Sequence, residues 1–243
     1  MIKEQFRSLL KKLGVRISAS GGYHRFNAIE DVLEHLQRIG FRPNLVIDGG
    51  ANVGDWATMA QRYFPGAEFH LVDPQPSVLV ALQNVAATLP QMQVHPVALV
   101  QPGVEQVTLW GSGTGATVAA TLKGERAVSV RAATLDSLFS EAAANRPPVF
   151  LKLDLEGHEI PALEGGRGLL AHCDFVLLEA SFYNVEDYGL PTFMELAAWM
   201  QRAGFDLYDI AALAGRKTDG RLRSGDVLFH RRDLPLLRDH RWE

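Results

Sequence analysis

Short apolar runs alternate with segments of helical periodicity over most of the chain. The runs predict seven main strands, at residues 45–47, 67–72, 92–100, 149–155, 175–178, 206–213 and 226–230. Helices are predicted between the first five strands, because apolar residues recur there at helical spacing, as at Trp56, Met59, Ala60 and Tyr63. Strands without polar alternation, separated by helices, indicate a parallel sheet covered on both faces. The last two strands are too close for a helix between them, which predicts an antiparallel pair.

The pattern therefore predicts an α/β fold: a doubly wound, mostly parallel seven-stranded sheet with an antiparallel last strand. A helix is also expected over 160–170, and two shorter strands over 106–110 and 127–131. The glycine- and threonine-rich stretch 111–124 between those strands is either a plain hairpin connection or a functional lid.

Residues 1–43 differ from the rest and read as an N-terminal helical extension. Apolar residues keep helical spacing in two places, before and after the break Ser-Ala-Ser-Gly-Gly at 18–22. Such helices would cap the core, cover a substrate or join two copies in a homodimer, and the sequence does not choose among these. Residues 44–243 are then expected to form one ligand-binding domain.

Composition narrows the class of protein. The chain has 243 residues, of which 47% are hydrophobic, and a formal net charge of −4. This charge does not favour binding to a nucleic acid, because proteins that bind nucleic acids usually have a basic surface. No apolar run reaches the length of a membrane helix, and the first residues lack the apolar core of a secretory signal. With its single cysteine, Cys173, the chain is expected to be cytoplasmic.

A glycine-rich loop follows the first predicted strand. It reads Asp48-Gly-Gly-Ala-Asn-Val-Gly54 and opens the next helix. In a doubly wound sheet, ligands bind beyond the carboxyl ends of the strands at the switch point. Glycine and asparagine allow the left-handed backbone that such a turn uses. Asp48, Gly50, Asn52 and Gly54 are therefore candidates for binding a cofactor.

The spacing of the glycines in this loop indicates which class of cofactor it binds. A dinucleotide site has glycines in a G-x-G-x-x-G pattern, and here the spacing differs. Asp48 would repel a pyrophosphate but would suit an ammonium group, such as that of a methionine moiety. Asp73 ends the second strand, where an acid hydrogen-bonds ribose hydroxyls in nucleotide-binding folds. We therefore expect an adenosine-containing ligand.

The fourth main strand carries an unusual set of ionisable residues. Because residues alternate faces along a strand, Lys152, Asp154 and Glu156 are expected on one side. A structural interpretation pairs Lys152 with Asp154 inside the sheet. A functional interpretation places Asp154, Glu156 and His158 against the reacting group, with His158 as the base.

Carboxylates at two neighbouring strand ends raise a second possibility. Glu179 ends the fifth strand, beside Asp154 and Glu156 in a parallel sheet. These three residues are candidate ligands for Mg²⁺, which prefers oxygen donors. The same residues are equally explained as groups that orient His158 or substrate hydroxyls. Farther along, Tyr183 and Tyr188 either line a substrate pocket or lie on a surface loop.

At these residues the chain resembles the FkbM-type methyltransferase family. The resemblance covers about residues 44–185 and depends on three segments, at 47–54, 134–136 and 151–159. It implies a Rossmann-like class I methyltransferase fold, S-adenosylmethionine as methyl donor and O-methylation of a sugar or polyketide-type hydroxyl. It also implies a cofactor role for Asp48, Gly50, Asn52, Gly54 and Asp73. Gly49 departs from the bulkier residue that is common there.

Three functions follow as hypotheses. The first is a small-molecule O-methyltransferase that uses S-adenosylmethionine. The second is an NAD(P)-dependent oxidoreductase on the same fold, against which the glycine spacing and Asp48 argue. The third is a non-catalytic protein that retains the cofactor site.

Overall fold

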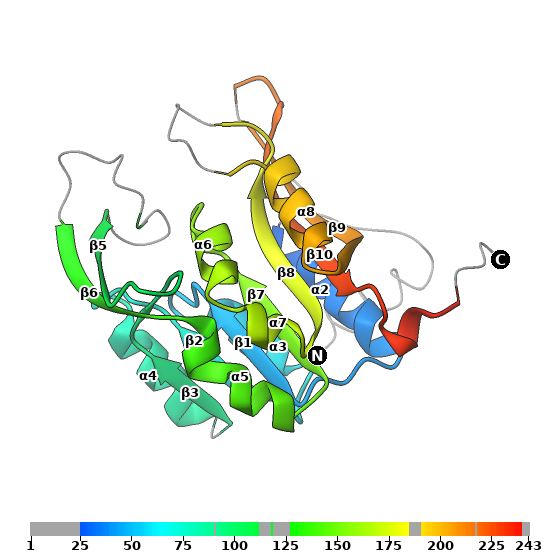
Figure 1. Cartoon of the computed structure of the whole chain (residues 1–243), viewed down its shortest axis with the longest axis horizontal. Helices are drawn as coiled ribbons and strands as arrows, with labels where there is room; N and C mark the ends of the chain where they lie inside the picture. Colours follow the sequence, from blue (N-terminus) through cyan, green and yellow to red (C-terminus); the bar gives the residue numbers. More distant parts are fainter. Residues whose placement is uncertain are drawn as a thin grey trace, which may run out of the picture.

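The computed structural model describes residues 25–89, 91–111, 118, 127–184, 191–216 and 218–239. Its main feature is a seven-stranded sheet of order β3-β2-β1-β7-β8-β10-β9 (Figure 1). In that order the strands span Met92–His95, Glu68–Val72, Leu45–Gly49, Val149–Leu153, Cys173–Ser181, Leu222–Arg231 and Phe205–Gly215. The five strands from β3 to β8 are parallel, and β10 runs antiparallel to both β8 and β9. This confirms the predicted α/β class and the antiparallel last strand.

The strand order creates a switch point between β1 and β7. The chain runs outward from β1 through β2 to β3, and later returns on the other side of β1 with β7. Connections therefore diverge from these two strands, and their carboxyl ends border a crevice. In the same register, Asp48 of β1 lies opposite Lys152 of β7.

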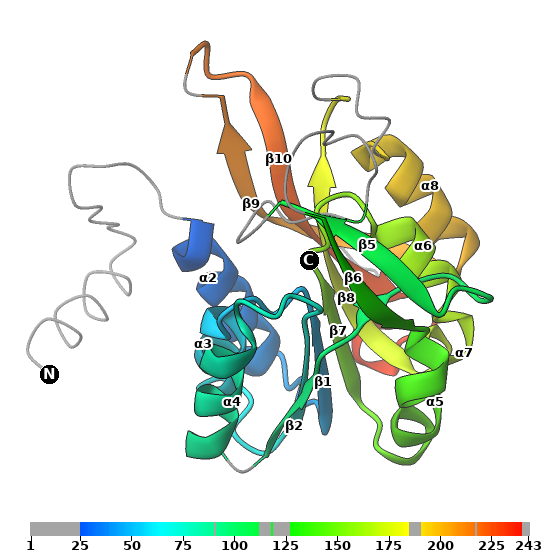
Figure 2. The same ribbon diagram turned by 90° about the vertical axis from the view of Figure 1, so that its left-hand side faces the viewer.

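Helices cover both faces of this sheet, as the continuous apolar strands predict (Figure 2). The helices of one face are α2 (Arg25–Arg38), α3 (Asp55–Gln61) and α4 (Leu79–Thr88). Those of the other are α5 (Leu135–Asn145), α6 (Glu159–Glu164), α7 (Arg167–Leu170) and α8 (Phe193–Arg202). Along β1, Val46 is buried in the core with α3, while Leu45 and Ile47 are buried in the core with α5.

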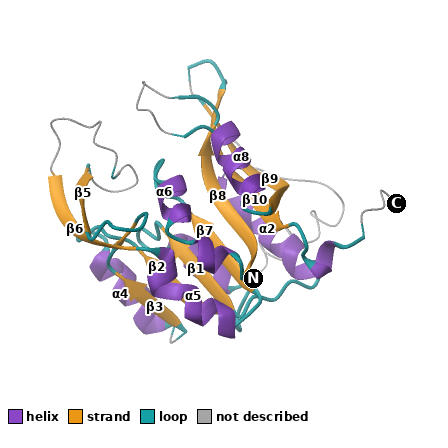
Figure 3. Cartoon of the chain, viewed as in Figure 1, coloured by secondary structure: helices purple, strands orange, loops and turns teal. Residues whose placement is uncertain are grey.

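The predicted third strand is divided in the structure. β3 ends at His95, and β4 (Ala98–Leu99) leaves the main sheet to pair with β6 (Ala127–Ala133). β6 also pairs antiparallel with β5 (Gln106–Trp110), so a three-stranded sheet forms (Figure 3). Pro96 sits at the break, and proline cannot donate a hydrogen bond to a neighbouring strand.

The single helix expected over 160–170 is also divided, into α6 and α7. Gly165 and Gly166 separate them, and both lie against other backbone or side chains. A Cβ at Gly165 would lie 2.1 Å from the carbonyl oxygen of Val100, and one at Gly166 2.8 Å from Leu135 Cδ1. Close packing against the small sheet and α5 therefore explains the glycines and the interruption.

The second N-terminal helix is present as α2, beside β9 (Figure 2). Its Ile29, Leu33 and Leu36 are buried in the core that also contains Phe150. His35 Nε2 lies 2.8 Å from the Tyr208 hydroxyl of β9. The first expected helix and most of the 111–124 stretch lie outside the described residues. Among those described, no helix has the length and apolar character that a membrane crossing requires.

Candidate functional site

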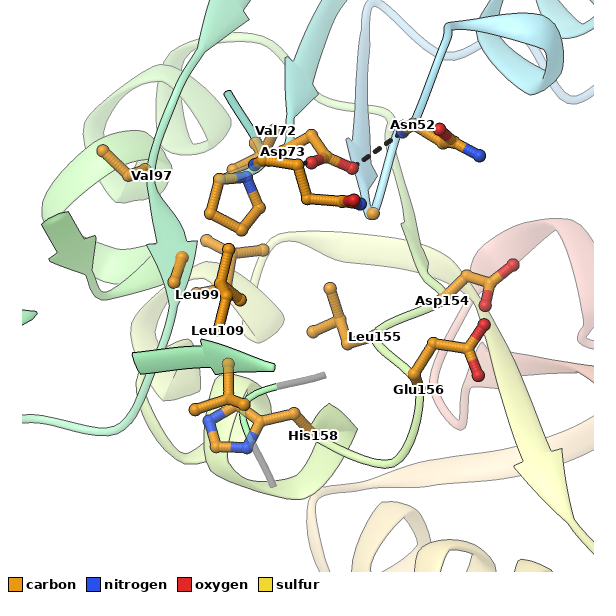
Figure 4. Close-up of a pocket in the computed structure, with 15 residues that line it drawn as sticks. Asn52, Val72, Asp73, Val97, Leu99, Leu109, Asp154, Leu155, Glu156 and His158 are labelled. Atoms are coloured by element: carbon orange, nitrogen blue, oxygen red, sulfur yellow. Dashed lines mark hydrogen bonds between the residues drawn. The ribbon is translucent and has the colours of Figure 1, made fainter. Parts of the chain in front are cut away.

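A pocket lies beyond the carboxyl ends of β1, β2 and β7 (Figure 4). It encloses about 700 Å³, including space open to solvent. One part of its lining comes from the loops after β1 and β2, another from the small sheet, and a third from the loop after β7. The lining residues are Gly50, Asn52, Val72, Asp73, Pro74, Gln75, Val97, Ala98, Leu99, Leu109, Val118, Asp154, Leu155, Glu156 and His158.

The glycine-rich loop adopts the left-handed backbone that its sequence predicts. Gly50 has φ +74°, Asn52 φ 47° and Gly54 φ 87°. A Cβ at Gly50 would lie only 1.9 Å from the carbonyl oxygen of Asp154, so no other residue fits. Gly50 and Asn52 line the pocket, whereas Gly54 precedes α3 and packs against Leu82 and Val85.

Asp73 anchors the two loops that meet at this pocket. Its Oδ2 accepts a hydrogen bond from the backbone N–H of Asn52 at 2.8 Å, and its Oδ1 accepts one from that of Gln75 at 2.9 Å. Burial raises the pKa of Asp73, and these donors oppose the rise. A carboxylate accepts several hydrogen bonds at once, so Asp73 has the chemistry to bind ribose hydroxyls as well.

Asp48 is fully buried below the pocket and does not line it. Its Oδ1 lies 3.0 Å from Lys152 Nζ, the strand neighbour across the β1–β7 register. Asp154 Oδ2 is farther from the same ammonium, at 3.9 Å. The ammonium group beside Asp48 is therefore that of Lys152, whereas the sequence suggested the ammonium group of a ligand.

Lys152 also holds the glycine-rich loop. Its Nζ donates hydrogen bonds to the carbonyl oxygens of Gly50, at 3.0 Å, and Gly49, at 3.3 Å. Burial alone would lower the pKa of Lys152, but the carboxylates of Asp48 and Asp154 raise it above its ordinary value. Lys152 is therefore a buried cation that ties the cofactor loop to β7.

The three proposed catalytic residues all line the pocket, but from different sides. β7 ends at Leu153, so face alternation does not extend to the loop that follows. Glu156 and Gly157 instead have φ 52° and 92°. Figure 4 shows the carboxylates of Asp154 and Glu156 turned toward each other, with His158 apart from them on the other side of Leu155. Burial lowers the pKa of His158, which keeps its imidazole neutral near pH 7.

Glu179 of β8 completes an acidic cluster with Asp154 and Glu156. One carboxylate oxygen from each lies within 4.8 Å of the others, as expected from adjacent parallel strands. This set has the oxygen ligands and spacing that a divalent cation accepts. Lys152 lies 3.9 Å from Asp154 and contributes positive charge to the same cluster.

Glu159 shapes the loop of the proposed catalytic residues, a role that sequence reasoning missed. Its carboxylate accepts hydrogen bonds from the backbone N–H groups of Leu155, at 2.8 Å, and Gly157, at 3.3 Å. Burial raises the pKa of Glu159 to about 7. An acid at the start of a helix usually indicates an interaction with the helix dipole, so the sequence alone did not reveal these two bonds.

Replacing Glu159 by glutamine should change how stability depends on pH. Because the pKa is about 4.5 in the unfolded chain and about 7 in the native state, the native state binds this proton more tightly. The stability that protonated Glu159 contributes is thus fully present below pH 4.5 and is lost as the pH rises to 7. Urea unfolding of Glu159→Gln at several pH values should show a flatter profile over that interval. Glu141→Gln, on the exposed face of α5, should match the wild type, and parallel curves for all three proteins would contradict this prediction.

The pocket's apolar wall also lay beyond sequence reasoning. Leu109 and Val118 come from the small sheet and its connection, far in sequence from the glycine-rich loop. Tyr183 follows β8 and is partly exposed, whereas Tyr188 lies outside the described residues.

Comparisons with known proteins bear on this site. No curated protein matches the sequence. Among solved structures, an FkbM methyltransferase from Methylobacillus flagellatus has 17% identity and a TM-score of 0.50, over 77% of this chain and 43% of that one. The chain thus spans less than half the length of that protein. An N1-methyltransferase of Burkholderia thailandensis, solved with S-adenosylhomocysteine, has 14% identity and a TM-score of 0.47, over 85% of this chain and 79% of that one.

A family model settles the relationship. The model of the methyltransferase FkbM domain matches residues 48–207, which include the glycine-rich loop, Asp73 and the loop after β7. This match covers more than half of the chain and agrees with the class I methyltransferase topology of the sheet. The chain therefore belongs to the FkbM family of S-adenosylmethionine-dependent methyltransferases.

Proposed function

We propose that this protein transfers a methyl group from S-adenosylmethionine to a hydroxyl oxygen of a small molecule. The observation that carries the proposal is the composition of the switch-point pocket. Asn52 and Asp73 line one side of the pocket. Asp154, Glu156 and His158, which belong to the loop after β7, line other parts of it. One cavity therefore contains side chains that can bind a nucleoside and side chains that can bind a hydroxylated acceptor.

The residues present fit the methyl donor. Asp73 offers a carboxylate for ribose hydroxyls, and apolar side chains from β2, β4 and β5 offer a surface for adenine. Gly50 and Asn52 would lie along the remainder of the donor, while Asp48 and Gly54 act through the shape of the loop. When bound, S-adenosylmethionine supplies an electrophilic methyl group on a positively charged sulfur.

The chain's own part in the reaction is to orient the acceptor and remove its proton. Asp154 and Glu156 accept hydrogen bonds from acceptor hydroxyls. The neutral imidazole of His158 would take the hydroxyl proton, and the bound donor would supply the methyl group and keep the electron pair of its carbon–sulfur bond. Positioning the hydroxyl in line with the methyl carbon supplies much of the remaining acceleration.

Charge and family membership support this function over the alternatives. The net charge of −4 suits a small-molecule acceptor better than a polyanionic nucleic acid. The methyltransferase family match favours methyl transfer over dinucleotide-dependent oxidation. A cytoplasmic location remains a proposal, and the free thiol of buried Cys173 agrees with a reducing compartment.

The function is tested by variants that separate binding from chemistry. His158→Ala and Asp154→Asn should bind S-adenosylmethionine with wild-type affinity in calorimetry. Loss of a general base typically lowers the rate by roughly 100-fold or more, so methyl transfer to a hydroxylated acceptor should fall accordingly. Full turnover by His158→Ala would reject His158 as the base, and absence of donor binding to the wild type would reject the function.

A divalent cation at Asp154, Glu156 and Glu179 remains the alternative use of the acidic cluster. We expect methyl transfer to persist in excess EDTA, because Lys152 already contributes positive charge beside Asp154. Turnover of protein treated with EDTA should therefore equal that of protein supplied with Mg²⁺. Loss of turnover in EDTA and recovery on addition of Mg²⁺ would instead assign the three carboxylates as metal ligands.

A further inference from the structure

The β9–β10 hairpin extends past the carboxyl end of the sheet, beside the end of β8 (Figures 1 and 2). Along the β8–β10 ladder, Asp226 pairs with Glu179 and Ser224 pairs with Ser181. The backbone N–H of Phe182 then donates to the carbonyl oxygen of Arg223 at 2.9 Å. The ladder therefore runs without a gap from the acidic cluster to the outer part of the hairpin.

Arg221 is stacked on Tyr183 at the outer end of this ladder. The carbon of its guanidinium group lies 3.9 Å from the centre of the Tyr183 ring. The face of an aromatic ring attracts a guanidinium group, so this contact limits the conformations of an otherwise exposed side chain. The stack thus presents a planar cation with part of its conformational freedom already lost.

The charge of this cation is not neutralised within the described part of the chain. Arg221 and Arg223 are both exposed, and no described carboxylate lies within ion-pair distance of either. Arg216 of the same hairpin differs, because its guanidinium contacts Asp219, at 3.3 Å, and Thr218, at 3.1 Å. Of the three arginines near the hairpin tip, Arg216 is thus already paired, whereas Arg221 and Arg223 have no carboxylate partner among the described residues and can meet an external anion.

The distance from this stack to the acidic cluster is within the length of a small molecule. Tyr183 lies four positions after Glu179, so their Cα atoms are within about 14 Å of each other even in a fully extended chain. In the sheet order, the pocket occupies the ends of β2, β1 and β7, and Tyr183 follows the next strand, β8. The arginine–tyrosine stack therefore lies on the acceptor's side of the pocket.

We propose that Arg221, stacked on Tyr183 and assisted by Arg223, binds a phosphate or carboxylate group of the methyl acceptor. This inference rests on the proposed function and names its substrate class: a hydroxylated small molecule that carries an anionic group at the end opposite the hydroxyl bound by the acidic cluster. A guanidinium group binds such oxyanions through two parallel hydrogen bonds. The hydroxyl end meets the acidic cluster and the anionic end meets the hairpin, which fixes the direction of the acceptor.

Inorganic pyrophosphate is a suitable probe for this site. Calorimetric titration into the full-length protein, with S-adenosylhomocysteine present and at 0.15 M salt to screen unspecific attraction, should detect binding. Arg221→Ala should weaken it by roughly tenfold or more. Tyr183→Ala should weaken it less, and Tyr183→Phe should restore it, because phenylalanine keeps the ring face. Arg216→Ala is the matched control and should bind pyrophosphate nearly as well as the wild type.

Three results would overturn this inference. They are absence of pyrophosphate binding to the wild type, equal losses in Arg216→Ala and Arg221→Ala, and preferential binding of a single-stranded oligoribonucleotide through Arg221. All variants should bind S-adenosylhomocysteine like the wild type. If the wild type binds pyrophosphate through Arg221 but does not bind S-adenosylhomocysteine, the proposed function fails and the anion site stands.

Discussion

Replacing Lys152 by methionine is expected to lower the free energy of unfolding by about 3–5 kcal/mol, the usual cost of breaking a buried ion pair from one side. The variant leaves the carboxylate of Asp48 fully buried without the cation that lies 3.0 Å away. It also leaves the carbonyl oxygens of Gly49 and Gly50 without their side-chain donor. Urea unfolding followed by circular dichroism measures the change.

A double variant distinguishes this cause from a general packing defect. Removing both charges with Asp48→Asn and Lys152→Met should recover much of the lost stability, because replacing both partners avoids an uncompensated buried charge. A single Lys152→Met variant within about 1 kcal/mol of the wild type would contradict the prediction, since that is the value of an exposed pair. A double variant less stable than Lys152→Met would contradict it as well.

Replacing Asp73 by alanine should weaken S-adenosylmethionine binding by roughly 100-fold, or about 3 kcal/mol, which is the upper range for a hydrogen bond to a charged group. Asp73 lines the pocket and anchors Asn52 and Gln75, so both the ribose contact and the loop geometry are affected. Calorimetric titration of the donor measures the dissociation constant.

Two further variants isolate the contribution of the ribose contact. Asp73→Asn keeps the shape and one acceptor oxygen, so it should lose less affinity than Asp73→Ala. Asp55→Ala removes an exposed acid at the start of α3, outside the pocket, and should bind like the wild type. Unchanged affinity in Asp73→Ala would remove the ribose assignment.

Local patterns predicted most of the sheet because each strand is a continuous apolar run covered on both faces. β1, β2, β7 and β8 are found where those runs predict them. The division at Pro96 was missed, since the apolar character continues through Ala98 and Leu99 while the backbone changes sheets. Only the pairing of β4 with β6, more than thirty residues later, shows where that segment belongs.

The position of a pocket-lining residue was predictable where it follows a strand end directly, as for Asn52, Asp73 and Asp154. Contacts were less predictable where a partner lies in a distant strand. Face alternation singled out Lys152, but its pairing with Asp48 depends on the β1–β7 register, which joins residues 104 positions apart. The contacts of Glu159 were unpredictable for a similar reason, because the sequence pattern does not show which backbone N–H groups will donate to a side chain.

The close approach of Gly50 to Asp154 has a consequence for changing what this enzyme methylates. Because Gly50 of the proposed donor loop packs against the backbone of Asp154, a redesign that moves this backbone would also disturb donor binding. The β9–β10 hairpin has no residue in the pocket lining. On the role proposed for Arg221, new acceptor preferences are therefore more readily engineered by exchanging the hairpin tip between homologues than by redesigning the segment after β7.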